Sequence, residues 1–149
     1  MVIAFIPVRG GSKSIPLKNI KPFCGKPLVC WSIEALEACK AVDRIIVATD
    51  CDKIEQTVLK YNYSKTYIYR RSAENACDTA STESVMLEYI NYAHLDVDDV
   101  FMLVQATSPL TEECHFTEAL TEYVNSEYDS MLTCCLLYTS DAADDLIGV

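Results

Sequence analysis

The fold is decided by the stretch VIAFIPV at residues 2–8, which is followed directly by RGGSK at residues 9–13. A short apolar run that ends at a pair of glycines is typical of a buried strand leading into a loop. Glycines let backbone amides approach a phosphate chain, and basic side chains neutralise its charge. Neither GxGxxG nor GxxxxGK[ST] occurs in the sequence, so these residues alone are consistent with a phosphate-binding loop or with a plain turn.

Further along the chain, segments with the periodicity of a strand alternate with segments that have the periodicity of a helix. The predicted strands are residues 2–8, 44–49, 67–70, 100–104 and 131–134. The predicted helices carry the apolar stripes Val29–Leu36, Ile54–Tyr61, Met86–Ala93 and Phe116–Tyr123. This alternation predicts an α/β fold, a three-layer, Rossmann-like, mostly parallel sheet. In such folds ligands bind at the C-terminal ends of the strands, where the polar loops lie.

The distribution of charge indicates a small anionic ligand near the N-terminus. The 149 residues have a formal net charge of −10, which argues against nucleic-acid binding because phosphate contacts need a surplus of Lys and Arg. Residues 1–33 nevertheless contain no acidic residue and five basic ones, Arg9, Lys13, Lys18, Lys21 and Lys26. A solvated lysine face is the alternative interpretation of this segment.

Length and composition predict a single soluble, cytoplasmic domain. Half of the residues are apolar, which is enough to form a core. The apolar N-terminus lacks the basic residues that begin a signal peptide, and no apolar run approaches the roughly 20 residues of a membrane-spanning helix. The eight cysteines form no CxxC pair, and several lie in apolar periodic segments. We therefore expect reduced, buried thiols, for example at Cys30, Cys39 and Cys134.

The C-terminal residues have a different character from the rest of the chain. From Cys135 the sequence CLLYTSDAAD resembles one translated reading frame of a transposase sequencing adapter. We expect residues 1–135 to be the N-terminal nucleotide-binding part of a truncated domain, and residues 136–149 to be an artefact tail. The natural protein is then expected to continue beyond residue 135.

Four sequence blocks occur in a characteristic order. They are IPVRGGSKSIPLKNI at residues 6–20 with GKPL at 25–28, IVATD at 46–50, CDTAS at 77–81 and LVQATSPL at 103–110. Together they closely resemble the acylneuraminate cytidylyltransferases, over residues 2 to about 134. The resemblance implies a fold of the nucleotide-diphospho-sugar transferase type.

The same resemblance implies an enzyme that transfers CMP from CTP to an acidic nine-carbon sugar and releases pyrophosphate. It also implies Mg²⁺ as cofactor and a homodimer for the full-length protein, with no nucleic-acid or membrane partner. A sibling enzyme for 3-deoxy-octulosonate or pseudaminic acid is one alternative, and a non-catalytic nucleotide-binding module is another. We expect the 149-residue chain to keep most of the CTP site and to be inactive by itself.

The resemblance also assigns roles to individual residues. Arg9 and Lys18 are expected to contact the triphosphate during catalysis, with Lys13 and the amides of Gly10, Gly11 and Ser12 nearby. The base and ribose contacts fall to Asn19, Arg71, Ala80 and Ser81, and the sugar contact falls to Gln105. Arg70 competes with Arg71 for its role. Asp50 is expected either to help bind the metal or to cap the next helix, for which Asp52 is another candidate; the principal metal ligands are expected beyond residue 135.

The chain departs from the family pattern at three positions. Ala106 stands where the family usually has proline, and Thr111 stands where it usually has arginine. Ser14 replaces the usual glycine after the loop lysine, which implies a different backbone conformation there. These changes leave Arg9 and Lys18 in place.

Overall fold

A computed structural model of the chain describes residues 1–11, 15–77 and 80–134. Its strands are β1 (Val2–Pro7), β2 (Pro22–Phe23), β3 (Lys26–Pro27), β4 (Arg44–Thr49), β5 (Thr66–Arg70) and β6 (Val100–Leu103). Its helices are η1 (Lys18–Ile20), α1 (Leu28–Ala38), α2 (Asp52–Leu59), α3 (Thr82–Ala93) and α4 (Glu113–Asn125). The chain divides after Glu118, within α4, into two compact units. The predictions for Ser12 and Lys13, and for the tail after residue 135, lie outside the described residues.

In the described part of the chain, β1 lies at the centre of a four-stranded sheet with the order β5-β4-β1-β6. All neighbouring strands are parallel, and the register places Phe5 of β1 beside Ile46 of β4 and Leu103 of β6. Parallel sheets are covered by helices on both faces, which explains why β1 and β4 are almost continuously apolar. The predicted α/β fold with a mostly parallel sheet is confirmed.

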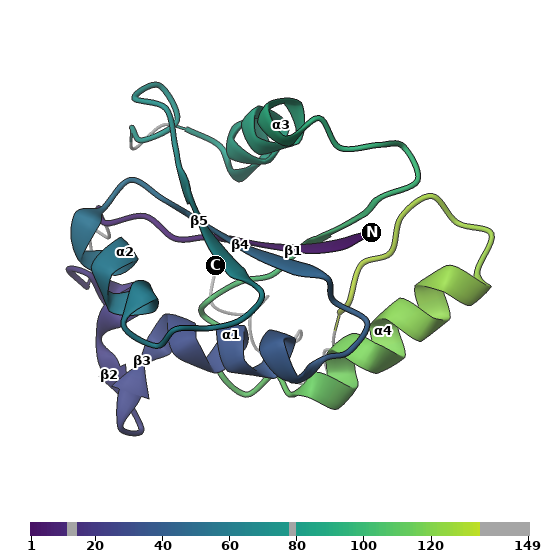
Figure 1. Cartoon of the computed structure of the whole chain (residues 1–149), viewed down its shortest axis with the longest axis horizontal. Coiled ribbons are helices and arrows are strands. Elements are labelled where there is room, and N and C mark those ends of the chain that lie inside the picture. Colours follow the sequence, from purple (N-terminus) through teal and green to yellow (C-terminus); the bar gives the residue numbers. More distant parts are fainter. Residues whose placement is uncertain (12–14, 78–79, 135–149) are drawn as a thin grey trace, which may run out of the picture. The chain divides into compact units, whose positions relative to one another are not determined.

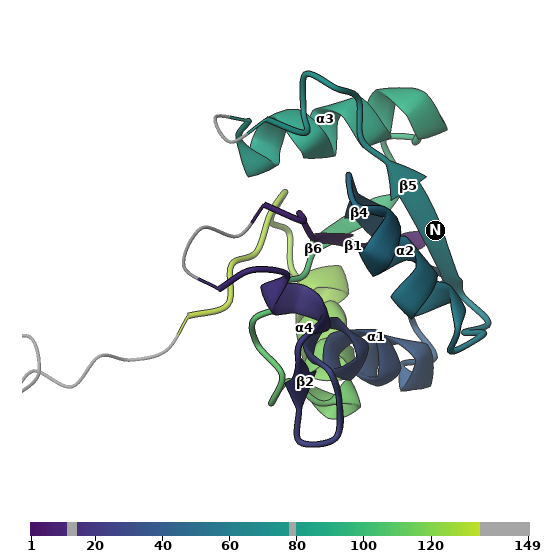
Figure 2. The same cartoon turned by 90° about the vertical axis from the view of Figure 1, so that its left-hand side faces the viewer.

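Both faces of the central strands β1 and β4 are buried, and each face packs against different helices (Figure 1). Ile3 and Phe5 on β1, together with Ile46 and Ala48 on β4, pack against Val85 and Tyr89 of α3. The alternate positions Ala4, Ile6, Ile45 and Val47 are also fully buried, because successive side chains of a strand point to opposite faces. Figure 1 shows α3 on one side of the sheet and α1 and α2 on the other, and Figure 2 shows the same separation of α3 from α1 after a quarter turn.

The order of the strands creates a crevice beside β1. The chain runs from β1 outward to β4 and β5, and then crosses back over β1 to β6. Since crossovers between parallel strands are right-handed, this reversal of direction places α3 on the opposite face from α1 and α2. The loops after β1 and β6 both return to the face of α1, where the Gln105 carbonyl accepts the Ser32 hydroxyl. The crevice lies between these loops and the start of α3 on the other face, at the C-terminal ends of the strands where ligands bind in open α/β sheets.

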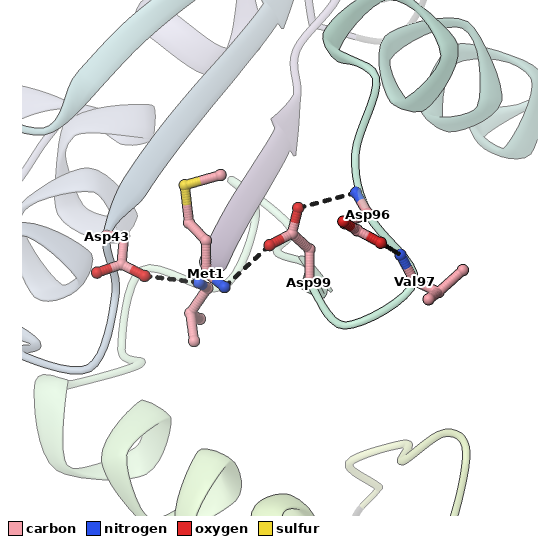
Figure 3. A network of polar contacts seen from close by, with 6 residues as sticks. Met1, Asp43, Asp96, Val97 and Asp99 are labelled. Carbon is pink, nitrogen blue, oxygen red and sulfur yellow. Dashed lines mark hydrogen bonds and ion pairs between the residues drawn. The ribbon is translucent and has the colours of Figure 1, made fainter.

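The opposite edge of the sheet, where the strands begin, collects acidic side chains (Figure 3). The Met1 ammonium donates to Asp99 Oδ1 over 2.9 Å, and the Val2 amide donates to Asp43 Oδ2 over 2.7 Å. Asp99 also accepts the amide of Asp96 over 3.0 Å. The hydrogen bond from Met1 lowers the pKa of Asp99, and in return Asp99 raises the pKa of the Met1 ammonium. These acids fasten the loops before β4 and β6 to the start of β1, far from the edge where β1 ends.

The strand predicted at residues 131–134 is wrong. These residues are described, and they form neither helix nor strand. Met131 is 44% exposed and Leu132 is 87% exposed, so their apolar side chains are not buried as the prediction required. A strand is stable only when a neighbour satisfies its backbone groups, and the described residues pair no strand with this segment. Cys134 is accordingly exposed, whereas Cys30 and Cys39 are buried thiols as predicted.

The described helices include no segment with the length and apolarity needed to cross a bilayer.

The loops after β1 and β4 are held together at the edge where these strands end. The Gly10 amide donates to Asp50 Oδ1 over 2.9 Å, which joins positions 40 residues apart. A Cβ atom at Gly10 would lie 2.8 Å from the Cβ and 3.1 Å from the Sγ of Cys51. Real Cβ atoms essentially never show contacts as short as 2.8 Å, so the close approach of the two loops requires glycine at position 10.

Replacing Gly10 by alanine tests this close approach. Gly10→Ala should lower the free energy of unfolding by about 1–3 kcal/mol, because the added methyl group has no room against Cys51. Urea denaturation followed by circular dichroism measures the change. In a Cys51→Gly background the same substitution should cost much less, so a double-mutant cycle without coupling between the two positions would contradict the steric explanation.

Candidate functional site

A pocket of about 730 Å³ opens where β1 and β6 end, at the crevice that the strand order creates. Four segments that are distant in sequence form its wall. The lining residues are Pro7, Arg9, Lys18, Asn19, Arg71, Ala80, Ser81, Thr82, Val85, Leu103, Gln105, Ala106 and Thr107. Cationic groups lie among these polar and apolar side chains, and no acidic residue belongs to the described lining.

The pocket brings together seven residues that the sequence singled out for nucleotide or sugar binding. They are Arg9, Lys18, Asn19, Arg71, Ala80, Ser81 and Gln105. Gly10, Gly11 and Asp50 do not belong to the lining, and Ser12 and Lys13 lie outside the described residues. The Gly10 amide, which the sequence suggested as a phosphate donor, is already bonded to Asp50. The roles of all these residues remain predictions.

Arg9 and η1 form the cationic side of the pocket. Arg9 follows β1, and its carbonyl accepts a hydrogen bond from Asn19 Nδ2 over 3.4 Å. Asn19 is buried, so its amide fixes η1 beside the end of β1 and presents Lys18 to the pocket. Leu17 precedes η1 with φ at 53°, a left-handed conformation that is costly for a branched side chain. The buried asparagine and this turn together determine where Lys18 lies.

Lys21 and Lys26, the other described lysines of the acid-free segment, do not line the pocket. Cys24 and Gly25 both have positive φ, 47° and 91°, and they form the turn of the β2–β3 hairpin. Lys26 at the end of this turn forms an ion pair with Glu34 and lies 3.8 Å from the centre of the Trp31 ring. The segment thus combines two functions: Arg9 and Lys18 line the pocket, and Lys26 attaches the hairpin to α1.

The two adjacent arginines at the end of β5 lie in different environments. The Arg71 amide donates to the Thr49 carbonyl over 3.2 Å, and its Nε and Nη2 donate to the Ala48 carbonyl over 3.1 and 2.9 Å. Burial lowers the pKa of Arg71, and the neighbouring Arg9 lowers it further, against the opposing effect of Asp50. Arg70 instead pairs with Asp52 and Glu55 of α2, outside the pocket lining.

The N-terminus of α3 forms the wall opposite Lys18. Ser81 is the N-cap of α3, and its hydroxyl accepts the Ser84 amide over 3.0 Å. The Ala80 amide donates to the Cys77 carbonyl over 3.2 Å. Thr82 and Val85 on the first turns of α3 also line the pocket, although the sequence did not single them out. They could not be recognised because they belong to the pocket only once α3 has packed on β1.

The loop after β6 forms the last wall. Its backbone is attached to α1, because the Ser32 hydroxyl donates to the Gln105 carbonyl over 3.5 Å. The Gln105 side chain is exposed, and its Oε1 accepts the Thr107 hydroxyl over 3.5 Å. Ala106, which replaces the usual proline, is only 4% exposed and lines the pocket beside Gln105.

Asp50 joins the loops after β1 and β4 and does not cap α2. Cys51 is the N-cap of α2 and makes no side-chain capping bond, so the prediction that Asp50 or Asp52 caps this helix is wrong. One carboxylate oxygen of Asp50 accepts the Gly10 amide instead. Within residues 1–11, 15–77 and 80–134, no three His, Cys, Asp or Glu side chains converge on a possible metal position. Mg²⁺ at phosphate sites is usually held by only one or two carboxylates together with phosphate oxygens and water. A contribution of Asp50 to metal binding, beside principal ligands beyond residue 135, therefore stays a prediction.

Comparison of the sequence with known proteins identifies its relatives. A family model described as cytidylyltransferase matches residues 3–143. N-acylneuraminate cytidylyltransferase A of Danio rerio is 36% identical over 132 residues, which cover 89% of this chain and 30% of the relative. Pseudaminic acid cytidylyltransferase of Campylobacter jejuni is 32% identical over 127 residues, which cover 84% of this chain and 54% of the relative. The chain thus spans about a third to a half of the length of these relatives.

Solved structures show the same fold at low sequence identity. CMP:2-keto-3-deoxy-manno-octonic acid synthetase complexed with CTP superimposes with a TM-score of 0.68 at 22% identity, over 84% of this chain and 48% of that chain. A 4-diphosphocytidyl-2C-methyl-D-erythritol synthase superimposes with a TM-score of 0.65 at 12% identity, over 84% of this chain and 55% of that chain. The fold agrees with the match of the family model, and the chain belongs to the cytidylyltransferase family.

Proposed function

We propose that this chain forms the CTP-binding part of an enzyme that transfers CMP from CTP to an acylneuraminate-type acidic sugar and releases pyrophosphate. One observation carries the proposal. A single pocket at the reversal point of the sheet contains the cations Arg9, Lys18 and Arg71 together with the Ala80–Ser81 turn and Gln105. The relatives named N-acylneuraminate cytidylyltransferase support this assignment of nucleotide and sugar.

The cationic side of the pocket suits the triphosphate. In the proposed reaction the anomeric hydroxyl of the sugar attacks the α-phosphorus, and the bond to pyrophosphate breaks. Negative charge develops on the phosphoryl oxygens and on the leaving group, so catalysis depends on positioned cations rather than on a protein nucleophile. Arg9 and Lys18 supply such cations, and the buried Asn19 holds them in place before CTP arrives.

The wall formed by Arg71 and α3 suits the cytosine base. Two of the five N–H donors of Arg71 bind the Ala48 carbonyl, so the guanidinium is oriented while other donors can reach a ligand. We assign these donors to the O2 and N3 acceptors of cytosine, and the Ala80 carbonyl to its exocyclic amine. Uracil lacks that amine and would leave the carbonyl unpaired, which favours CTP over UTP.

Gln105 is assigned to the acyl sugar because it lies exposed at the mouth of the pocket. A second candidate sugar is pseudaminic acid, since a pseudaminic acid cytidylyltransferase is among the relatives above 30% identity.

For the complete protein we propose Mg²⁺ as cofactor, homodimerisation and a cytoplasmic location. Asp50, whose Oδ1 accepts the Gly10 amide beside the pocket, is the described residue that we assign to the metal, together with principal ligands beyond residue 135.

The triphosphate assignment predicts a specific effect at Lys18. In the complete protein, Lys18→Ala should reduce kcat/KM for CTP on the order of 100-fold, because a cation positioned at the transferring phosphate is lost. Pyrophosphate release with CTP and N-acetylneuraminate measures the rate. Lys21→Ala is the matched control, because Lys21 lies three residues further along and outside the pocket lining. Equal effects of the two substitutions, or no effect of either, would refute the assignment.

The base assignment predicts a contrast between the two adjacent arginines. Arg71→Ala should weaken CTP binding by roughly tenfold or more, because buried acceptors of the base would lose a charged donor. Arg70→Ala should leave CTP binding unchanged, because Arg70 pairs with α2. Isothermal titration calorimetry of the complete protein measures both affinities. A larger loss at Arg70 than at Arg71 would reverse the assignment.

A further inference from the structure

The two elements assigned to the base lie on either side of a loop, and a side chain outside the pocket connects them. Arg71 begins this loop at the end of β5, and the Ala80–Ser81 turn ends it at the start of α3. Between them, residues 72–75 fold back onto α3. There they meet Glu88, which lies on the second half of that helix and does not belong to the pocket lining.

Glu88 accepts hydrogen bonds at both carboxylate oxygens. Its Oε1 accepts the Tyr69 hydroxyl over 2.6 Å and the Ser72 amide over 2.9 Å. Its Oε2 accepts the Ser72 hydroxyl over 2.7 Å and a bond from Asn75 Nδ2. Burial by itself would raise the pKa of Glu88, but the bonds from Tyr69, Asn75 and Ser72 outweigh this effect and lower it to about 2. Only an ionised carboxylate can accept from all of these donors at once.

Asn75 extends this network to the other wall of the pocket. Its Oδ1 accepts the Ser84 hydroxyl over 2.7 Å, and its backbone amide donates to the Ser72 hydroxyl over 3.3 Å. The Ser84 amide in turn donates to the Ser81 hydroxyl over 3.0 Å, and the Ser84 hydroxyl contacts the Ser81 carbonyl over 2.8 Å. An unbroken series of hydrogen bonds therefore runs from Ser72, next to Arg71, to Ser81 in the pocket wall.

The network is anchored in the hydrophobic core at its other end. The ring of Tyr69 lies 5.1 Å from that of Tyr89, which lies 5.4 Å from that of the fully buried Phe5. Burial and the bond to Glu88 raise the pKa of the Tyr69 hydroxyl, so it remains a donor at neutral pH. One of the partners of Glu88, Tyr69, is thus fixed by its packing against the core of the sheet.

We propose that Glu88 is a positioning residue for base selection, which sets the distance between Arg71 and the Ala80–Ser81 turn. This inference rests on the proposed function, in which these two elements contact opposite parts of cytosine. Discrimination between cytosine and uracil depends on both contacts forming at once, and such contacts tolerate displacements of only about 0.5 Å. When Glu88 is removed, the loop is released from α3, and the pocket should still bind a nucleoside triphosphate while selecting its base poorly.

The ratio of kcat/KM for CTP to that for UTP, measured on the complete protein, tests this inference. Glu88→Ala should reduce kcat/KM for CTP roughly tenfold and leave the value for UTP nearly unchanged, so the ratio should fall by the same factor. The loss should appear mainly in KM for CTP, because Arg9 and Lys18 remain in place. Glu83→Ala is the matched control: Glu83 is an exposed carboxylate on the same helix, outside the pocket lining.

Two further variants separate positioning from general stabilisation. Glu88→Gln keeps the size of the side chain and one of its two acceptor oxygens. Its ratio of kcat/KM for CTP to that for UTP should therefore lie between those of the wild type and Glu88→Ala. Asn75→Ala removes the link to Ser84 and leaves the bonds of Glu88 to Tyr69 and Ser72, so it should also lower the ratio. If Glu88→Ala does not fold, as judged by its thermal midpoint, the CTP/UTP ratio of Asn75→Ala tests the positioning role instead.

The possible outcomes distinguish this inference from the proposed function. A wild-type protein that does not prefer CTP to UTP would overturn the proposed function, and this inference with it. A wild-type preference that persists unchanged in folded Glu88→Ala, or in Asn75→Ala, would overturn this inference alone. This inference would also be overturned if Glu88→Ala and Asn75→Ala lowered the thermal midpoint without changing the CTP/UTP ratio, because Glu88 would then only stabilise the fold.

Discussion

The parallel pairing of β1 with β4 on one side and β6 on the other is the constraint on which the rest of the structure depends. Because β1 is central, its side chains must be apolar on both faces, and helices must cover both. Because the chain moves from β1 outward to β4 and β5 and then crosses back to β6, α3 covers the face opposite α1 and α2 (Figure 1). The pocket lies between the start of α3 and the loops after β1 and β6, so its position follows from strand order rather than from any particular binding residue.

Charge is separated along the direction of the strands. The carboxylates of Asp43, Asp96 and Asp99 accept hydrogen bonds from backbone amides and from the Met1 ammonium where the strands begin. Arg9, Lys18 and Arg71 instead line the pocket where β1 and β6 end. A chain with a net charge of −10 can therefore present a positive surface to an anion. The low pKa of Asp99 and the lowered pKa of Arg71 have different physical origins, since a cation stabilises the first and burial causes the second.

The walls of the pocket are held by polar contacts between segments that are far apart in sequence. Gly10 binds Asp50, Asn19 binds the Arg9 carbonyl, and Arg71 binds the Ala48 carbonyl. Each contact joins a loop to a strand end, so the binding groups are positioned before a ligand is present. Glu88 extends this arrangement outside the pocket, where it connects the loop after β5 to α3.

The sequence by itself determined the order and type of the main elements, because the periods of strands and helices are local properties of residues such as those of β1, β4 and α3. It also indicated most of the pocket lining, largely through the blocks that contain Arg9, Ala80 and Gln105. Only the tertiary structure decided which of Arg70 and Arg71 faces the pocket, that Asp50 binds Gly10, and that residues 131–134 form no strand. These outcomes depend on which distant segments come into contact, and neither periodicity nor residue type specifies such contacts.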